Sequence, residues 1–215
     1  MVQRYRGYLF DLDGTLVDTA PDINRAMNAA LTSAGLQPVA EALTRHWVGY
    51  GSRVLMQQAL DHQKQSHDGL ETLLADFIAH YEAHIADHSR PYPGVTEALQ
   101  ALKSAGAGLA VVTNKLTRLS MPLLDALNLT PLFDCIVCGD TAAQPKPAPD
   151  PALHACEALS LPVDAVLFVG DSETDVGCAR AAGCDIVCVA DGYNHGVAPE
   201  DLGADAIIDS FKDLV

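Results

Sequence analysis

The feature that most constrains the fold is a regular alternation of short apolar segments with helical patterns, which runs from Pro91 to the end of the chain. The apolar segments are nearly continuous, as expected for strands buried on both faces of a parallel sheet. We expect strands at residues 109–113, 135–138, 165–169, 185–189 and 206–208. The segments between them predict helices near residues 95–105, 118–127, 151–159 and 173–182. This order predicts an α/β fold with a doubly wound parallel sheet.

The apolar run at residues 8–10 predicts one more strand, which ends in two carboxylates, Asp11 and Asp13. Side chains at i and i+2 of an extended segment point to the same side, so both carboxylates can face one pocket. Gly14 then permits a turn that a side chain would obstruct. Two carboxylates this close repel each other unless a cation lies between them or one is protonated. The pair indicates a metal-assisted nucleophile with an acid–base partner, and the alternative is an acidic turn that only keeps the sheet end soluble.

The segment between the first strand and Pro91 is different, because it contains helical patterns and no convincing strand. We expect four helices there, near residues 20–34, 41–48, 52–60 and 70–89. We therefore predict a helical insertion at residues 19–90 within an α/β domain made of residues 1–18 and 91–215.

Composition excludes several classes of partner. The chain has 28 acidic and 13 basic residues, a formal net charge of −15 and a pI near 4.6. We therefore expect no nucleic-acid partner and no anionic membrane partner. No apolar run approaches the length that spans a membrane, and the run before Asp11 is too short for a signal peptide. The six cysteines lie in apolar patterns, which predicts reduced thiols, and we expect a cytoplasmic protein.

Polar side chains cluster where three of the predicted strands end. Asp11 and Asp13 follow the first strand, Thr113-Asn114-Lys115 follows the next, and the segment 170–175 contains three acidic residues. In open parallel sheets, ligands bind beyond the carboxyl ends of the strands, near the point where the strand order reverses. The sequence therefore predicts that these three strand ends form one site.

The chain resembles the haloacid dehalogenase-like phosphatases in four strings that occur in the same order: Asp11-Leu12-Asp13-Gly14-Thr15, Thr113-Asn114, Lys146-Pro147, and Gly170-Asp171-Ser172 with Asp175. The resemblance spans nearly the whole chain. It implies a doubly wound core with a helical cap inserted after the first string, which agrees with the organisation predicted above.

The resemblance also implies catalytic roles. Asp11 would attack phosphorus and become an aspartyl phosphate, and Asp13 would protonate the leaving oxygen and then activate water. The Thr113 hydroxyl and the Asn114 backbone amide would hold phosphoryl oxygens, and Lys146 would neutralise charge on the transferring group. Taken singly, Thr113 and Asn114 could simply end a strand, and Lys146 could be an ordinary loop lysine.

The implied cofactor is Mg²⁺. Its ligands would be the Asp11 carboxylate, the Asp13 backbone carbonyl and the Asp171 carboxylate, with Asp175 as an additional or supporting acid. The plain alternative for Asp171 and Asp175 is that they are acids favoured by a helix N-terminus.

Asp13 narrows the reaction class. Dehalogenases of this kind lack a carboxylate two residues after the nucleophile, and phosphonatases have a small residue there. Phosphomutases keep all four strings and remain an alternative, as does a phosphate-binding module without catalytic activity. The expected partner is a small-molecule phosphomonoester, and the expected assembly is a monomer or a homodimer.

Within the phosphatases, the strings at residues 89–95, 111–115, 138–141 and 192–196 resemble those of the phosphoglycolate phosphatase family. A similar group acts on N-acetylmuramic acid 6-phosphate, and other sugar phosphates also stay open. A small carboxylated substrate needs a cation from the cap. Arg53 and Arg45 are the candidates, with surface salt bridges as the alternative for both. We expect the turn from Gly49 to Arg53 to close over the leaving group.

Overall fold

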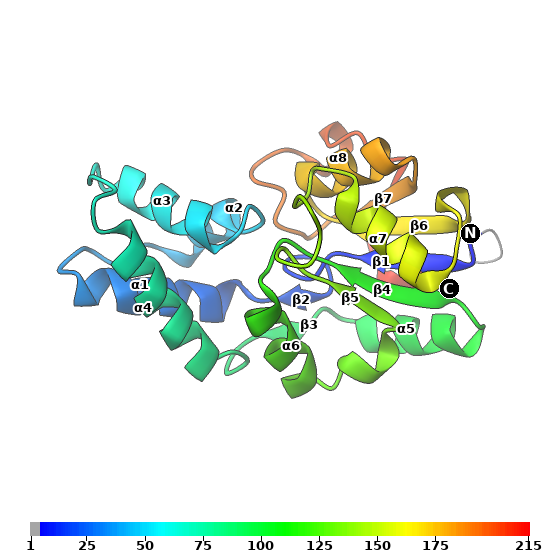
Figure 1. Cartoon of the computed structure of the whole chain (residues 1–215), viewed down its shortest axis with the longest axis horizontal. Coiled ribbons are helices and arrows are strands. Elements are labelled where there is room, and N and C mark those ends of the chain that lie inside the picture. The colour runs from blue at the N-terminus through cyan, green and yellow to red at the C-terminus, as the bar shows by residue number, and fades with distance from the viewer. Residues whose placement is uncertain (1–4) are drawn as a thin grey trace.

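The computed structural model describes residues 5–215, which form an α/β unit and a group of four helices beside it (Figure 1). None of the helices described is long and apolar enough to cross a membrane. The α/β unit is built on a six-stranded sheet in the order β5-β4-β1-β6-β7-β8, and every neighbouring pair is parallel. The strands are β1 (Gly7–Phe10), β4 (Gly108–Val112), β5 (Cys135–Val137), β6 (Val166–Gly170), β7 (Asp185–Val189) and β8 (Ala206–Ile208). The predicted α/β class with a doubly wound sheet is confirmed.

Helices cover both faces of this sheet (Figure 1). One face packs against α5 (Val95–Ser104) and α6 (Thr117–Ala126), and the other against α7 (Asp150–Leu159) and α8 (Glu173–Ala182). β1 supplies both cores, because Tyr8 and Phe10 point to the first face and Leu9 to the second. Four short 3₁₀ helices complete the unit: Thr130–Leu132, Val163–Ala165, Pro199–Asp201 and Phe211–Leu214.

The helical group has its own apolar core. Its helices are α1 (Ala20–Ser33), α2 (Glu41–Trp47), α3 (Ser52–His62) and α4 (Leu70–Ala83). Met27, Met56 and Phe77 are almost completely buried in this core, which Leu119 and Tyr193 of the α/β unit join from outside. The separate core supports our proposal that residues 19–90 form a cap domain on a core made of residues 1–18 and 91–215.

The end of α4 differs from the sequence-based expectation. We expected this helix to continue to about residue 89, but it ends at Ala83. The backbone N–H groups of His88 and Ser89 donate instead to the carboxylate of Asp22, at 2.7 to 3.1 Å. The Ser89 hydroxyl donates to the same carboxylate at 2.7 Å. These bonds satisfy the donors that a longer helix would have used, so the chain turns back toward the sheet.

Two short antiparallel strands join the two parts of the molecule. β2 (Val17–Asp18) leads into the helical group and β3 (Arg90–Pro91) leads out of it, with Val17 opposite Pro91 and Asp18 opposite Arg90. The sequence did not predict this pair, because two residues carry no periodicity. The outgoing and returning chains therefore lie side by side.

Candidate active site

The site lies where three adjacent strands end. β1 is the central strand of the trio β4-β1-β6, so the residues after these three strands meet at one edge of the sheet. Asp11 follows β1, Thr113 follows β4 and Asp171 follows β6. The expected convergence of the strand ends is therefore what the fold produces. Lys146, on the loop before α7, reaches the same place, with its Nζ 2.7 Å from Asp11 Oδ1.

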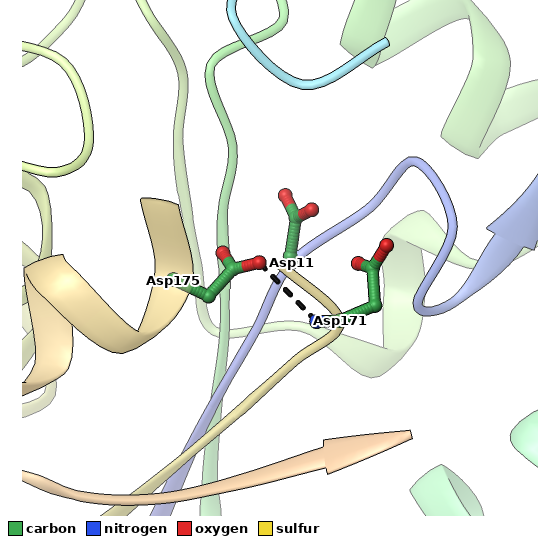
Figure 2. A group of neighbouring side chains, drawn as sticks. All are labelled: Asp11, Asp171 and Asp175. Atoms are coloured by element: carbon green, nitrogen blue, oxygen red, sulfur yellow. Dashed lines mark hydrogen bonds between the residues drawn. The ribbon is translucent and has the colours of Figure 1, made fainter. Parts of the chain in front are cut away.

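Three buried carboxylates form the centre of the site. Asp11, Asp171 and Asp175 each offer one oxygen, and these oxygens lie within 4.8 Å of one another (Figure 2). Burial, followed in size by the charge of nearby carboxylates, raises the pKa of Asp171 well above its ordinary value. Burial likewise raises the pKa of Asp11 to about 7, even though the Lys146 charge opposes it. The cluster is thus short of positive charge, and its all-oxygen donor set suits a hard divalent cation such as Mg²⁺.

Asp171 is held in place by the turn that follows β1 and by the segment that follows β7. One carboxylate oxygen accepts the hydroxyl of Thr15, and the other accepts the backbone N–H of Tyr193 at 2.6 Å. Gly14 has a φ of +90°, and a Cβ at this position would lie 2.5 Å from Asp171 Oδ2. A side chain there would displace the carboxylate, so glycine is needed for space as well as for its backbone conformation.

Asp175 supports its neighbours. It lies in the first turn of α8, where Ser172 is the N-cap, and the two residues form a capping box. Its Oδ2 accepts the backbone N–H groups of Asp171 and Ser172 at 3.2 and 3.1 Å, and the Ser172 hydroxyl at 2.7 Å. Its Oδ1 accepts Lys146 Nζ at 2.6 Å. Asp175 accepts four hydrogen bonds in all, against two for Asp171, so the geometry favours a supporting role for Asp175 over direct metal ligation.

Lys146 bridges two of the acids and is almost completely buried. Burial would lower the pKa of Lys146, but the charges of Asp11 and Asp175 outweigh it and raise this pKa. The lysine therefore stays charged. Its backbone is fixed by the side chain of Asn114, which accepts the Lys146 N–H at 2.8 Å and donates to the Lys146 carbonyl at 3.0 Å.

Asn114 also touches the helical group. Its Nδ2 donates to the Gly49 carbonyl at 2.9 Å, so one amide links the lysine loop to the segment between α2 and α3. The sequence predicted Asn114 only through its backbone amide, and this side-chain role was missed. Thr113 is buried beside it, and its hydroxyl oxygen accepts the backbone N–H of Lys115 at 3.2 Å.

Lys115 is a second buried lysine, which sequence reasoning did not select. Its Nζ lies 2.8 Å from Asp13 Oδ1, which also accepts the Thr19 hydroxyl at 2.6 Å. Burial would lower the pKa of Lys115, but the Asp13 charge outweighs it and raises this pKa. The available signal was its position directly after Thr113-Asn114 at a strand end.

A small cavity opens between these strand ends and the helical group. Its volume is about 40 Å³, and Asp11 and Asp13 are among the residues that line it. The other lining residues come from the cap and from the end of β4: Ile23, Val48, Gly49, Gly51, Ser52, Leu55, Phe77, Tyr81, Thr113, Asn114 and Lys115. The cavity therefore connects the candidate nucleophile with groups of the cap that could select a leaving group.

The structure does not bring Arg53 or Arg45 to this cavity. Arg53 lies at the start of α3, half exposed, and its guanidinium donates twice to Glu71 at 2.6 and 2.9 Å. It lines a neighbouring hollow with Ser52 and Asn114. Arg45 pairs with Asp18 and Glu41 at 2.9 and 2.8 Å. The role of Arg53 at the substrate stays a prediction; in this structure a carboxylate on the adjacent helix, that of Glu71, pairs with it.

Comparison with known proteins gives a consistent picture. Residues 8–189 match the model of a family described as haloacid dehalogenase-like hydrolase. The chain is 43% identical over 207 residues to a phosphoglycolate phosphatase of Caulobacter vibrioides, covering 95% of this chain and 87% of the relative. It is 42% identical over 208 residues to a phosphoglycolate phosphatase of Agrobacterium fabrum, covering 96% and 89%.

Solved structures are similar over nearly the whole chain. A predicted phosphoglycolate phosphatase from Haemophilus somnus superposes with a TM-score of 0.92 at 34% identity, covering 98% of this chain and 96% of the other. CbbY from Rhodobacter sphaeroides in complex with phosphate superposes with a TM-score of 0.83 at 26% identity, covering 98% and 96%.

Proposed function

Since this chain belongs to the haloacid dehalogenase-like hydrolase family, we propose that it is a Mg²⁺-dependent phosphomonoesterase that hydrolyses 2-phosphoglycolate to glycolate and phosphate. The reaction is supported by one observation above all. The carboxylate of Asp11, which lines a small cavity, lies against the buried ammonium of Lys146. This pairing offers a nucleophile and, next to it, a charge for the phosphoryl oxygens.

In the first step, an Asp11 carboxylate oxygen forms a bond to phosphorus as the bond from phosphorus to the leaving oxygen breaks. Asp13 donates a proton to that oxygen, so that an alcohol departs. Lys146 stabilises the negative charge on the phosphoryl oxygens. The products are the free alcohol and an aspartyl phosphate on Asp11.

In the second step, Asp13, now ionised, takes a proton from water while the water oxygen bonds to phosphorus. The bond between phosphorus and Asp11 breaks, which releases phosphate and regenerates the Asp11 carboxylate, while Asp13 is again protonated as it was before the first step. The Thr113 hydroxyl and the Asn114 backbone N–H hold the phosphoryl oxygens through both steps. Asn114 can do so without leaving its contacts to Lys146 and Gly49, because those contacts use its side chain.

The carboxylates of Asp11 and Asp171, with the Asp13 backbone carbonyl, are the proposed Mg²⁺ ligands, and Asp175 fixes Asp171 and Lys146 beside them. Mg²⁺, when bound, supplies the positive charge that the buried cluster lacks and reduces the repulsion between anionic nucleophile and phosphate. The raised pKa values of Asp11 and Asp171 support this assignment, because burial, and after it the charge of neighbouring carboxylates, disfavours the ionised form of both acids when no cation is present.

Two observations support 2-phosphoglycolate among the possible esters. The relatives named phosphoglycolate phosphatase match the chain over 95% of its length or more, and the cavity beside Asp11 is small, at about 40 Å³, which favours a small leaving group over a sugar. N-acetylmuramic acid 6-phosphate carries a far bulkier group on its phosphate. A phosphomutase would need room for a sugar and would return the phosphoryl group to it.

We also propose that the protein is located in the cytoplasm. The six cysteines are free, and five of them are buried, which fits a reducing environment.

The test is phosphate release in the presence of Mg²⁺ from 2-phosphoglycolate, N-acetylmuramic acid 6-phosphate and several hexose phosphates. We expect kcat/KM for 2-phosphoglycolate to lead by about tenfold or more, which corresponds to about 1.4 kcal/mol of transition-state discrimination. If kcat/KM is highest for N-acetylmuramic acid 6-phosphate, the proposed substrate is wrong and the proposed mechanism stands. Isomerised sugar phosphate without phosphate release would indicate a mutase.

A further inference from the structure

The proposed substrate presents a charge that the predicted arginines do not meet. In 2-phosphoglycolate a single methylene separates the ester oxygen from a carboxylate, so this second anion must lie close to the group that protonates the ester oxygen. That group is Asp13 in the proposed function. Among the described residues that line the cavity, Lys115 is the one with a cationic side chain, and its Nζ lies 2.8 Å from Asp13.

A second cavity residue has a buried hydroxyl without an acceptor. Tyr81 of α4 is 1% exposed, and within residues 5–215 its hydroxyl donates no hydrogen bond, although the Lys115 ammonium lies beside it. A buried donor without an acceptor is costly, which makes it a candidate to bind an anion that the protein alone does not supply. Burial raises the pKa of Tyr81 to about 12, so the hydroxyl keeps its proton and can donate it.

The two groups lie next to each other. Lys115 Nζ is 4.6 Å from the centre of the Tyr81 ring, close enough for a cation–π contact. They come from different parts of the chain, because Lys115 follows β4 of the core whereas Tyr81 belongs to the cap. An anion bound by both would therefore join cap and core.

We propose that Lys115 and Tyr81 form the subsite for the carboxylate of the leaving group, and this proposal rests on the proposed function. The Lys115 ammonium and the Tyr81 hydroxyl each donate one hydrogen bond to that carboxylate. Lys115 thereby contacts both the substrate and Asp13, so the ester oxygen is placed within reach of Asp13. Ser52, at the N-terminus of α3, lines the same cavity and adds the favourable end of a helix dipole.

The test compares 2-phosphoglycolate with ethyl phosphate, which has a methyl group in place of the carboxylate. Tyr81→Phe removes the donor and keeps the ring. We expect its kcat/KM for 2-phosphoglycolate to fall by about tenfold and its kcat/KM for ethyl phosphate to change by less than about twofold. Tyr92→Phe is the matched control, because the Tyr92 hydroxyl is also buried without a partner in the described chain but lines a different hollow. The control should leave both values unchanged.

Two substitutions of Lys115, one that removes its charge and one that keeps it, test the role of this charge. Lys115→Met should lower the preference for 2-phosphoglycolate over ethyl phosphate more than Lys115→Arg does, because arginine keeps a cation that can bind the carboxylate. As a readout independent of turnover, the dissociation constant of glycolate, measured by calorimetry, should rise in Tyr81→Phe and Lys115→Met. Melting temperatures of all variants identify any that fail to fold.

The outcomes separate the two proposals. If the wild-type enzyme prefers 2-phosphoglycolate and Tyr81→Phe and Lys115→Met keep that preference, the subsite is wrong and the function stands. Equal losses on both substrates would also overturn the subsite, because they indicate a general structural role. If the wild-type enzyme cleaves both esters equally well, the proposed substrate fails and the subsite fails with it.

Discussion

Asp11 shows how a candidate catalytic residue can oppose stability. It is buried beside Asp171 and Asp175, and its pKa is raised to about 7. A carboxyl group whose pKa is raised on folding takes up a proton, so its stabilising contribution is complete below the ordinary value of 3.8 and is lost as the pH rises through about 7. At alkaline pH without metal, ionised Asp11 therefore destabilises the folded protein.

We predict that Asp11→Asn raises the melting temperature of the metal-free protein by about 2–4 °C near pH 8. The amide has the shape of the carboxylate without its charge. Phosphate release should fall by roughly a thousandfold or more, because an amide does not attack phosphorus. Thermal unfolding with a chelator present measures the first effect. The stabilisation should shrink toward about pH 5, and one that grew in acid would contradict this account.

Residues of the site differ in how far the sequence could predict them. Asp11, Asp13 and Lys146 were selected because ordered strings or strand ends point to them, and the fold brings them together. Tyr81 was not selected, because on a helix it follows the same apolar period as any core residue. Arg53 was selected by its place in a glycine-rich turn, but its partner, Glu71, is 18 positions away and no local pattern indicates it.

At the level of elements, Asp22 fixes the return of the chain from the cap to the core. Its buried carboxylate accepts two backbone N–H groups, from His88 and Ser89, and one hydroxyl. The acid lies in the first turn of α1, which also favours a negative charge. One residue thus joins the start of the first cap helix to the segment that follows the last.

We predict that Asp22→Ala lowers the free energy of unfolding by about 3 kcal/mol, because it leaves buried backbone donors without an acceptor. Chemical denaturation measures this value. Asp76→Ala is the matched control, since Asp76 is an exposed acid on α4, and its effect should stay within about 0.5 kcal/mol. If both variants lose the same free energy of unfolding, the loss comes from removing a negative charge and not from the contacts of Asp22.

The helices and strands themselves were largely predictable. The six strands of the sheet lie within a residue or two of their predicted ranges, because buried parallel strands read as apolar runs. The β2–β3 pair and the early end of α4 were not predictable. Both depend on contacts between residues about 70 positions apart, and hydrophobic periodicity reports only local structure.

For the whole molecule, the buried acids link metal binding to pH. Mg²⁺ binds ionised carboxylates, and both Asp11 and Asp171 have raised pKa values in the metal-free protein. The stabilising contribution of Asp11 to the metal-free fold is present in acid and is lost as the pH rises through about 7, and that of Asp171 is also lost as the pH rises. Bound metal should reverse that loss.

We therefore predict that saturating Mg²⁺ changes the melting temperature little near pH 5 and raises it by several degrees near pH 8. Thermal unfolding with Mg²⁺ and with a chelator, at each pH, measures the difference. Asp171→Asn should largely abolish the response because it removes a ligand. A Mg²⁺ effect of equal size at both pH values would count against the buried acids as the binding site.

The pairing of β2 with β3 has a consequence for how such a protein can change over generations. The cap leaves and re-enters the core at one place, between Asp18 and Arg90, which lie opposite each other. A related protein could lose, lengthen or exchange the segment between β2 and β3, and a short turn could still connect these two strands. Asp11, Lys146 and Asp171 all lie outside this segment. The candidate catalytic residues can therefore be kept while the helical insertion is replaced. The substrate can then change without any change to the residues at the strand ends.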